Sequence, residues 1–326
     1  MSGPAEGDLV LNLVWTGRVF DQLSLFTESL LGACRARLRF IANACPPDQL
    51  EAMEDFGARH PGRIVEVVEV SRDRMVRHGD ALDEVLRTRD DGELFGLIDP
   101  DIVARAPFLP LFLDLLDDHA AVTSGREVWS DHNTRPADHI GVNGEYFFDQ
   151  DGFAFGSPHV AVYRAGPLRS TIERWGVGFS SAGNDITDAA RGRLKEVGRD
   201  YWVYDTGKIV NILLQADGHP LVHVENPSLV HIGGVSHYLA PPSSVGDGRH
   251  RWGEEPEWGE QEGQQVRYAI ARFTAAVLTE LQAGRAIPEV PADVPTGTHD
   301  KMVLVRDTMV ELVERHGRVD DGAGRP

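Results

Sequence analysis

Two carboxylates stand one residue apart directly after a short apolar run, in the stretch 94–101 (LFGLIDPD). A continuous apolar run of this length, bounded by turn residues, is typical of a buried strand in a parallel sheet. Because side chains alternate along a strand, Asp99 and Asp101 point the same way if the chain stays extended. Two neighbouring anions repel each other, and a Mg²⁺ or Mn²⁺ ion held with substrate phosphates would remove that repulsion.

The position of the pair favours a ligand site, because open α/β sheets bind ligands at the carboxyl ends of their strands. A second interpretation stays open, since Asp-Pro-Asp after a strand is also ordinary turn chemistry.

Composition limits the classes of function. The chain has 326 residues, of which 41% are hydrophobic and 25% charged, and its net charge is −19. This charge argues against a nucleic-acid partner or an anionic membrane surface, but a metal ion could still offset the charge of a nucleotide. The two cysteines, Cys34 and Cys45, are expected to be buried free thiols in a reducing compartment. No signal peptide and no membrane span is expected, so we predict a cytoplasmic protein.

Strands and helices alternate before the carboxylate pair. Apolar periodicity predicts strands at 9–15, 38–43, 63–70 and 94–98 and helices at 20–32, 47–57 and 71–87. The βαβαβαβ order implies a parallel sheet with helices on its faces. Further strands are predicted at 120–124, 159–164 and 221–224, and further helices at 107–117, 167–175 and 185–197.

The segment 125–156 has no periodicity and is rich in Asp, His, Asn, Gly and aromatic residues. A long irregular segment in a compact domain is either a binding loop or a packed excursion without a ligand, and the sequence supports both equally. Trp129, Tyr146 and Trp175 could stack on a sugar ring, although an aromatic core is the commoner outcome.

Four stretches together resemble the GT-A fold glycosyltransferases, and among them the family-2-like nucleotide-sugar enzymes. The stretches are 9–18, 40–45, the helix at 78–83 followed by 97–101, and Tyr204-Asp205-Thr206 followed by 231–236 (HIGGVS). The resemblance covers roughly residues 9–237. Two departures argue against a processive polysaccharide synthase: Tyr204-Asp205 replaces the usual Glu-Asp pair, and no Gln-x-x-Arg-Trp segment is present.

The resemblance implies an α/β GT-A fold, Rossmann-like, with a mainly parallel central sheet flanked by helices and a C-terminal helical extension. It implies a catalytic domain over 1–240, with a nucleotide-binding half at 9–124 and an acceptor half at 125–240. We expect a flexible linker or flap at 241–262, C-terminal helices at 263–316 and a disordered tail at 317–326. The C-terminal helices could dock on the domain or pair two subunits in a homodimer.

By the same resemblance, Asp99 and Asp101 hold a Mn²⁺ or Mg²⁺ ion, with Asp99 near the ribose or the sugar. His231 is a further metal ligand or touches the phosphates; the alternative is a core histidine at a strand end. Nucleotide-pocket residues would be Asn12, Thr16, Arg18, Asn43, His78, Asp83 and Asp99, and the alternative for all but Asp99 is a surface or capping position.

Asp205 is the candidate general base of an inverting reaction, because a helix N-terminus keeps a carboxylate ionised and ready to accept a hydroxyl proton. It could equally be an N-cap that binds the amide of Gly207 or Lys208. Asp185 is the reserve candidate.

These expectations give a hexosyltransferase-type enzyme (EC 2.4) that uses a nucleoside-diphosphate sugar, most simply a UDP-sugar, and a small or soluble acceptor. One alternative is a haloacid-dehalogenase-like phosphatase with Asp99 as nucleophile and Asp101 as acid/base, although that motif normally follows the first strand. A sugar-nucleotide-forming nucleotidyltransferase would need a Gly-rich N-terminal loop that is absent here. A non-catalytic sugar-nucleotide-binding domain is a further alternative.

Overall fold

The computed structural model describes residues 5–131, 133–139, 146–182, 185–201, 204–235 and 262–317. Residues 241–261 of the predicted linker and 318–326 of the predicted tail therefore lie outside the described residues. No helix in these described ranges has the length and apolar composition needed to cross a membrane.

A seven-stranded sheet forms the centre of the molecule, with the order β3-β2-β1-β4-β7-β6-β8. The strands are β1 (Val10–Thr16), β2 (Arg37–Asn43), β3 (Ile64–Ser71), β4 (Leu94–Ile98), β6 (Ala121–Ser124), β7 (Val160–Arg164) and β8 (Leu221–His223). The strands β1 to β4 are parallel, and β8 is parallel to β6. β7 runs antiparallel to both of its neighbours, β4 and β6. The predicted α/β class with a mainly parallel sheet is confirmed.

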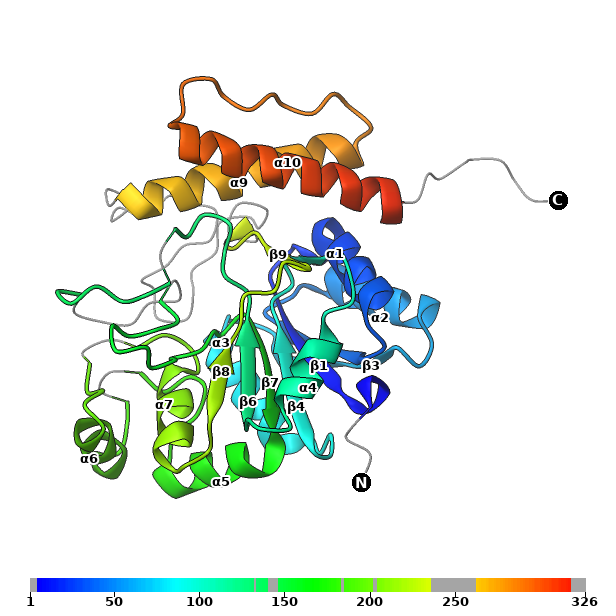
Figure 1. Ribbon diagram of the computed structural model, residues 1–326. Coiled ribbons are helices and arrows are strands. Elements are labelled where there is room, and N and C mark those ends of the chain that lie inside the picture. Colours follow the sequence, from blue (N-terminus) through cyan, green and yellow to red (C-terminus); the bar gives the residue numbers. More distant parts are fainter. Residues whose placement is uncertain are drawn as a thin grey trace.

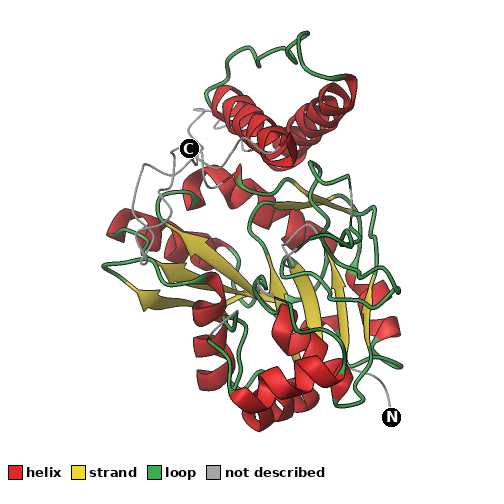
Figure 2. Cartoon of the chain, turned by 90° about the vertical axis from the view of Figure 1, so that its left-hand side faces the viewer, coloured by secondary structure: helices red, strands yellow, loops and turns green. Residues whose placement is uncertain are grey.

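Helices cover both faces of the sheet (Figures 1 and 2). The described helices are α1 (Phe20–Ala33), α2 (Pro47–Arg59), α3 (His78–Thr88), α4 (Leu109–Leu115), α5 (Ala165–Trp175), α6 (Asp188–Glu196), α7 (Lys208–Ala216) and, beyond the end of the sheet, α9 (Glu262–Gln282) and α10 (Thr296–His316), with a short 3₁₀ turn η1 (Glu6–Asp8). Because side chains alternate along β1, they pack into two separate parts of the core. Leu11, Leu13 and Trp15 pack with α1 and α2. Val14 faces the other way, toward α3, α5 and α7.

The helix predicted to start at residue 71 begins at His78 instead. The intervening segment is held open by Asn43, whose side-chain amide donates to the Val76 carbonyl and accepts from the Val76 N–H. This long-range contact overrides the local helical pattern, and it could not be predicted from the spacing of apolar residues.

A second, two-stranded sheet was not predicted. β5 (Ile102–Ala104) pairs antiparallel with β9 (Leu229–His231), so that Ile102 lies opposite His231. The described parts of 125–156 form only isolated bridges, of which Glu127 with His231 is one. The prediction of an irregular segment is therefore confirmed for these parts.

The C-terminal extension docks on its own chain. α9 and α10 pack against each other and against α1. Their buried side chains, including Ile270, Val277, Met302 and Val305, join the core on the α1 side. Figure 1 shows the two helices lying above the end of the sheet where β1 and β4 finish. Of the two predicted arrangements, the structure contains docking on the domain.

Candidate active site

The end of β4 is the point where three other segments meet. The Asp99 N–H donates to the carbonyl of His159, which precedes β7, at 2.8 Å. The chain then turns through Asp101 into β5, and the pairing of β5 with β9 brings His231 alongside. Asp99 is one-fifth exposed, whereas Asp101 and His231 are buried. The two carboxylates and the histidine therefore share one environment.

His231 is oriented by a hydrogen bond at one ring nitrogen and by carboxylates at the other. Its Nδ1 lies 2.7 Å from the carbonyl oxygen of Gly125, which can only accept a hydrogen bond, so Nδ1 is the donor. Its Nε2 faces the carboxylates, 3.3 Å from Asp101 Oδ1 and 3.8 Å from Asp99 Oδ2. A carbonyl partner that fixes one nitrogen while the other points at the site is the usual arrangement of a metal-binding histidine.

His159 is a site residue that the sequence analysis missed. Its Nδ1 lies 2.9 Å from Asp99 Oδ2, and its Nε2 lies 2.8 Å from Glu127 Oε1. Glu127 is itself buried. The predicted strand contained His159, but only the antiparallel placement of β7 beside β4 brings it to Asp99. No local pattern in the sequence signals that placement.

Asp99, His159 and His231 fit a divalent metal ion. Each offers one ligand atom, and these atoms all lie within 4.8 Å of one another. Imidazole nitrogen and carboxylate oxygen together suit Mn²⁺ and other first-row ions, whereas Mg²⁺ prefers oxygen alone. Asp101, which was predicted as a direct ligand, lies beside this group and contacts His231.

The charges of these buried groups shift the pKa values of their neighbours. Burial alone would raise the pKa of Glu127, but the charge and hydrogen bond of His159 lower it to about 2. Burial would lower the pKa of His159, but Glu127 and Asp99 raise it to about 10. Burial would also raise the pKa of Asp101, which His231 lowers instead. These groups therefore stabilise one another in their charged forms as ion pairs.

Several of the residues predicted to bind the nucleotide lie, like Asp99, at the carboxyl end of the central strands. Thr16 ends β1 and pairs in register with Asn43 at the end of β2, next to β4. Arg18 follows with a half-exposed ion pair to Asp48. His78 Nε2 lies 3.8 Å from Asp99 Oδ1. Asn43, in contrast, uses its amide to hold the Val76 backbone.

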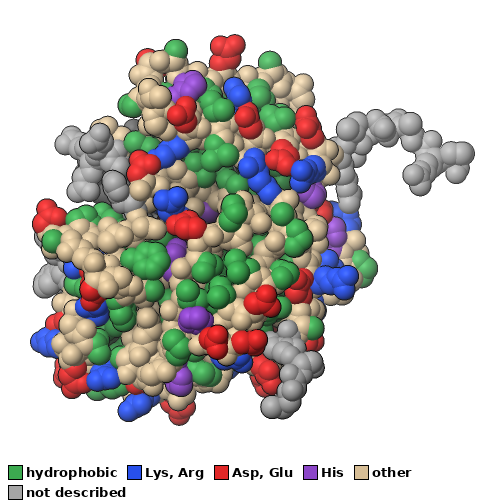
Figure 3. Space-filling view, in the orientation of Figure 1, with side chains coloured by type: hydrophobic (Ala, Val, Ile, Leu, Met, Phe, Trp, Pro, Cys, Tyr) green, Lys and Arg blue, Asp and Glu red, His purple; other side chains and the backbone are tan. Residues whose placement is uncertain are grey.

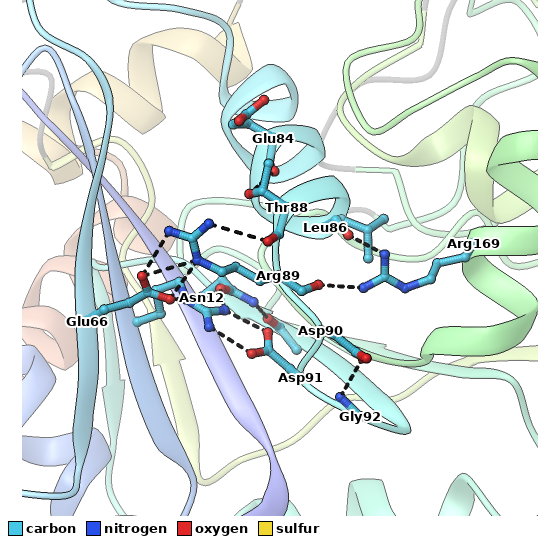
Figure 4. A network of polar contacts seen from close by, with 12 residues as sticks. Asn12, Glu66, Glu84, Leu86, Thr88, Arg89, Asp90, Asp91, Gly92 and Arg169 are labelled. Atoms are coloured by element: carbon cyan, nitrogen blue, oxygen red, sulfur yellow. Dashed lines mark hydrogen bonds and ion pairs between the residues drawn. The ribbon is translucent and has the colours of Figure 1, made fainter.

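Asn12 and Asp83 have other partners. Asn12 donates to the Gly96 carbonyl and accepts from Arg39, within a buried ion network at the opposite edge of the sheet (Figure 4). Both polar atoms of the Asn12 side chain therefore have partners toward the amino end of the strands, and its place in the nucleotide pocket stays a prediction. Asp83 accepts from the amides of Phe179 and Ser180, so it fixes the 178–180 turn against α3.

The two base candidates differ in their surroundings. Asp205 accepts from the Thr206 N–H, and the N-cap of α7 is Gly207, so Asp205 is not the cap of that helix. Asp185 is exposed and pairs with Arg77 at 3.2 Å, directly before α3. Because Arg77 directly precedes His78 in the sequence, this pairing places Asp185 near the start of α3.

Neither a protein-family model nor a curated protein sequence matches the chain. Among solved structures, the chain is similar to the galactosyltransferase LgtC with donor and acceptor sugar analogues (13% identity, 90% of this chain and 100% of that one, TM-score 0.42). It is also similar to the mannosyltransferase PcManGT from Pyrobaculum calidifontis in complex with GDP-Man and Mn²⁺ (15%, 97% and 76%, TM-score 0.38). A third is 4-diphosphocytidyl-2C-methyl-D-erythritol synthase from Anaerococcus prevotii (12%, 68% and 89%, TM-score 0.36). At these low values the functional conclusion rests on the site itself.

Proposed function

We propose that this chain is a metal-dependent glycosyltransferase of the GT-A type, which moves a sugar from a nucleoside-diphosphate sugar to an acceptor hydroxyl. The observation that carries the proposal is the convergence of Asp99, His159 and His231 at the carboxyl end of β4, where their ligand atoms could hold one divalent ion and Asp101 lies beside them. The carboxyl ends of β1 and β2 lie beside that of β4, and we propose that the nucleoside binds there.

In this proposal Asp99, His159 and His231 hold the ion, and Asp101 orients His231 or completes the ligand set. A bound Mn²⁺ or Mg²⁺ ion supplies a Lewis acid that stabilises the charge of a leaving diphosphate. Gly125 keeps the His231 ring turned toward the carboxylates, and Glu127 does the same for His159. Thr16, Arg18 and His78 are the proposed donor contacts.

Asp205 is the proposed general base. The Thr206 N–H fixes the orientation of its carboxylate, which would accept the proton of the attacking hydroxyl in a single displacement with inversion. Asp185 is the second candidate for the general base. The proposed donor is a UDP-sugar, the acceptor is small or soluble, and the proposed compartment is the cytoplasm.

The test is a thermal-shift screen of UDP-, GDP- and dTDP-sugars with and without Mn²⁺, followed by an assay for hydrolysis of any stabilising donor. We expect stabilisation that requires both donor and metal, and its loss in Asp101→Ala. Asp114→Ala, an exposed change on α4, is the matched control. If no sugar nucleotide stabilises the protein, the donor assignment is wrong. Cleavage of an aryl phosphate would favour the phosphatase, and formation of a sugar nucleotide from a nucleoside triphosphate would favour a nucleotidyltransferase.

A further inference from the structure

The loop that follows β6 contacts both histidines of the candidate metal site. The carbonyl of Gly125 accepts a hydrogen bond from His231 Nδ1, and the Val128 N–H donates to the His231 carbonyl at 2.8 Å. Between these two residues, the buried carboxylate of Glu127 lies 2.8 Å from His159 Nε2. The orientation of both imidazole rings therefore depends on where this loop lies.

The loop has little regular structure of its own. Among the described residues, 125–131 contains no helix and no strand, and its pairing with β9 is an isolated bridge between Glu127 and His231. The Ser130 N–H closes a turn on the Glu127 carbonyl at 3.0 Å. A segment outside regular structure is held mainly by the contacts that other elements make with it. The contacts at the 129–131 end of the loop therefore bear on the end that orients the histidines.

The C-terminal extension supplies those contacts. Lys301 of α10 donates to the Trp129 carbonyl at 3.0 Å and to the Asp131 carboxylate at 2.5 Å. The Lys301 side chain is only 16% exposed. Because an ammonium group withdrawn from water is costly unless it is hydrogen-bonded, these two acceptors hold Lys301, and Lys301 in turn holds the loop.

The other helix of the extension, α9, reaches the same region. Its Arg267 guanidinium lies 5.3 Å from the centre of the Trp129 ring, within the range of a cation–π contact. A Cβ atom at Gly234 would lie 3.3 Å from Arg267 Nε, so α9 also lies against the chain three residues after His231. Figure 1 shows the two helices lying across the end of the domain that carries β9. The extension therefore contacts the loop and also the segment that follows His231.

The docking of the extension does not depend on Lys301 alone. Both helices pack against α1, and their buried apolar side chains join the core on that side. On the face drawn in Figure 3, the extension carries Lys and Arg side chains interspersed with Asp and Glu. A general attraction between charges is therefore not what holds the extension, and removal of one cation should loosen the loop without detaching the helices.

We propose that the C-terminal helices support the metal site, and that Lys301 is a positioning residue that acts on His159 and His231 through the 125–131 loop. Lys301 itself contacts the loop and not the metal ligands. The inference rests on the proposed function for the presence of the metal ion. Because coupling between two sites is reciprocal, a metal ion that requires the loop in place must also stabilise the contact between the loop and α10.

The first experiment measures Mn²⁺ binding by titration calorimetry. Lys301→Met removes the donor and keeps the apolar part of the side chain. We expect it to bind Mn²⁺ about two- to thirtyfold more weakly than the wild type, the range for changes that reach a site through intervening contacts. Lys301→Arg keeps a cationic donor and should recover most of the loss. Arg306→Met removes the same charge from the same helix, where Arg306 pairs with neighbouring Asp307, and should bind Mn²⁺ like the wild type.

The second experiment uses the wild-type protein, so it does not depend on the folding of a variant. Amide hydrogen exchange is followed with Mn²⁺ and with a chelator. We expect Mn²⁺ to slow exchange in α10 more than in α6, which packs against α7. A general increase in stability would slow both helices alike, whereas the proposed coupling favours α10.

The outcomes separate the two proposals. If folded Lys301→Met binds Mn²⁺ as tightly as the wild type, or if Mn²⁺ slows exchange no more in α10 than in α6, the positioning role is overturned and the metal site stands. If the wild type binds no Mn²⁺, the metal-dependent function and this inference fail together. If Lys301 behaves as expected but no sugar nucleotide stabilises the protein, only the transferase assignment fails. Urea unfolding confirms that each variant is folded during the titration.

Discussion

Buried charges lie at both ends of the central strands, and they are balanced in different ways. At the amino end, Arg39 of β2 makes two 2.7 Å hydrogen bonds to Asp91 and one to Glu66, which also pairs with Arg89 (Figure 4). At the carboxyl end, histidines take the place of arginines: His159 bridges Asp99 and Glu127, and His231 faces Asp101.

The difference between these side chains separates a structural cluster from a functional one. Burial would lower the pKa of Arg39, but its pairs with Asp91 and Glu66 raise it, so the guanidinium charge is permanent. An imidazole can give up its proton and bind a metal ion instead. The arginine cluster can therefore only hold strands together, whereas the histidine cluster can exchange protons for a divalent cation.

The largest effect is expected at the amino end. Arg39→Met leaves Asp91 without its cation, while Glu66 keeps Arg89, and breaking a buried pair by removing one partner costs about 3–5 kcal/mol. We expect urea unfolding to show this loss, with Mn²⁺ affinity unchanged in the folded protein. A change in metal affinity would mean that the two ends are coupled through the sheet.

A smaller effect is expected at the carboxyl end. His159→Gln should weaken Mn²⁺ binding about ten- to a hundredfold, the usual cost of losing a group that binds or orients a metal site. Glutamine can still donate to Glu127, so stability should change less than in Arg39→Met. His60→Gln, which alters the separate His60–Glu28 pair, is the matched control. Unchanged Mn²⁺ affinity in calorimetry would remove His159 from the site.

The smallest effect is a gradual pH dependence of the metal-free protein. The pKa of His159 is raised from 6.5 to about 10, so its contribution to stability is complete below pH 6.5 and is lost as the pH rises to 10. The pKa of Glu127 is lowered from 4.5 to about 2, so its contribution is lost as the pH falls through that range. Melting temperatures should therefore fall from pH 6.5 to 10, and less so in His159→Gln. Equal slopes in the two proteins would contradict the ion pairing.

The sequence predicts the parts of the site that lie in local patterns. Asp99 and Asp101 follow an apolar run that is indeed a buried strand, and His231 was associated with them by resemblance alone. His159 and Glu127 were missed because strand order is not a local property. Nothing in residues 159–164 indicates that this strand runs antiparallel beside β4. Likewise, nothing in residues 125–131 indicates that Glu127 pairs with His159. Asn12 was assigned to the nucleotide pocket by resemblance, and the partners of its side chain, Gly96 and Arg39, could not be predicted from the sequence because they come from other strands.

The antiparallel direction of β7 has one more consequence. β6 and β7 are hydrogen-bonded neighbours, with Ser124 opposite Val160, so the excursion between them starts and finishes above the same small area. Its two ends are fastened there by the contact of Glu127 with His159. Since doubling the length of a flexible loop costs only about 0.6 kcal/mol, evolution could lengthen or replace this excursion without moving the groups beneath it. The site thereby depends on the two ends of this excursion, Glu127 and His159, and much less on its length.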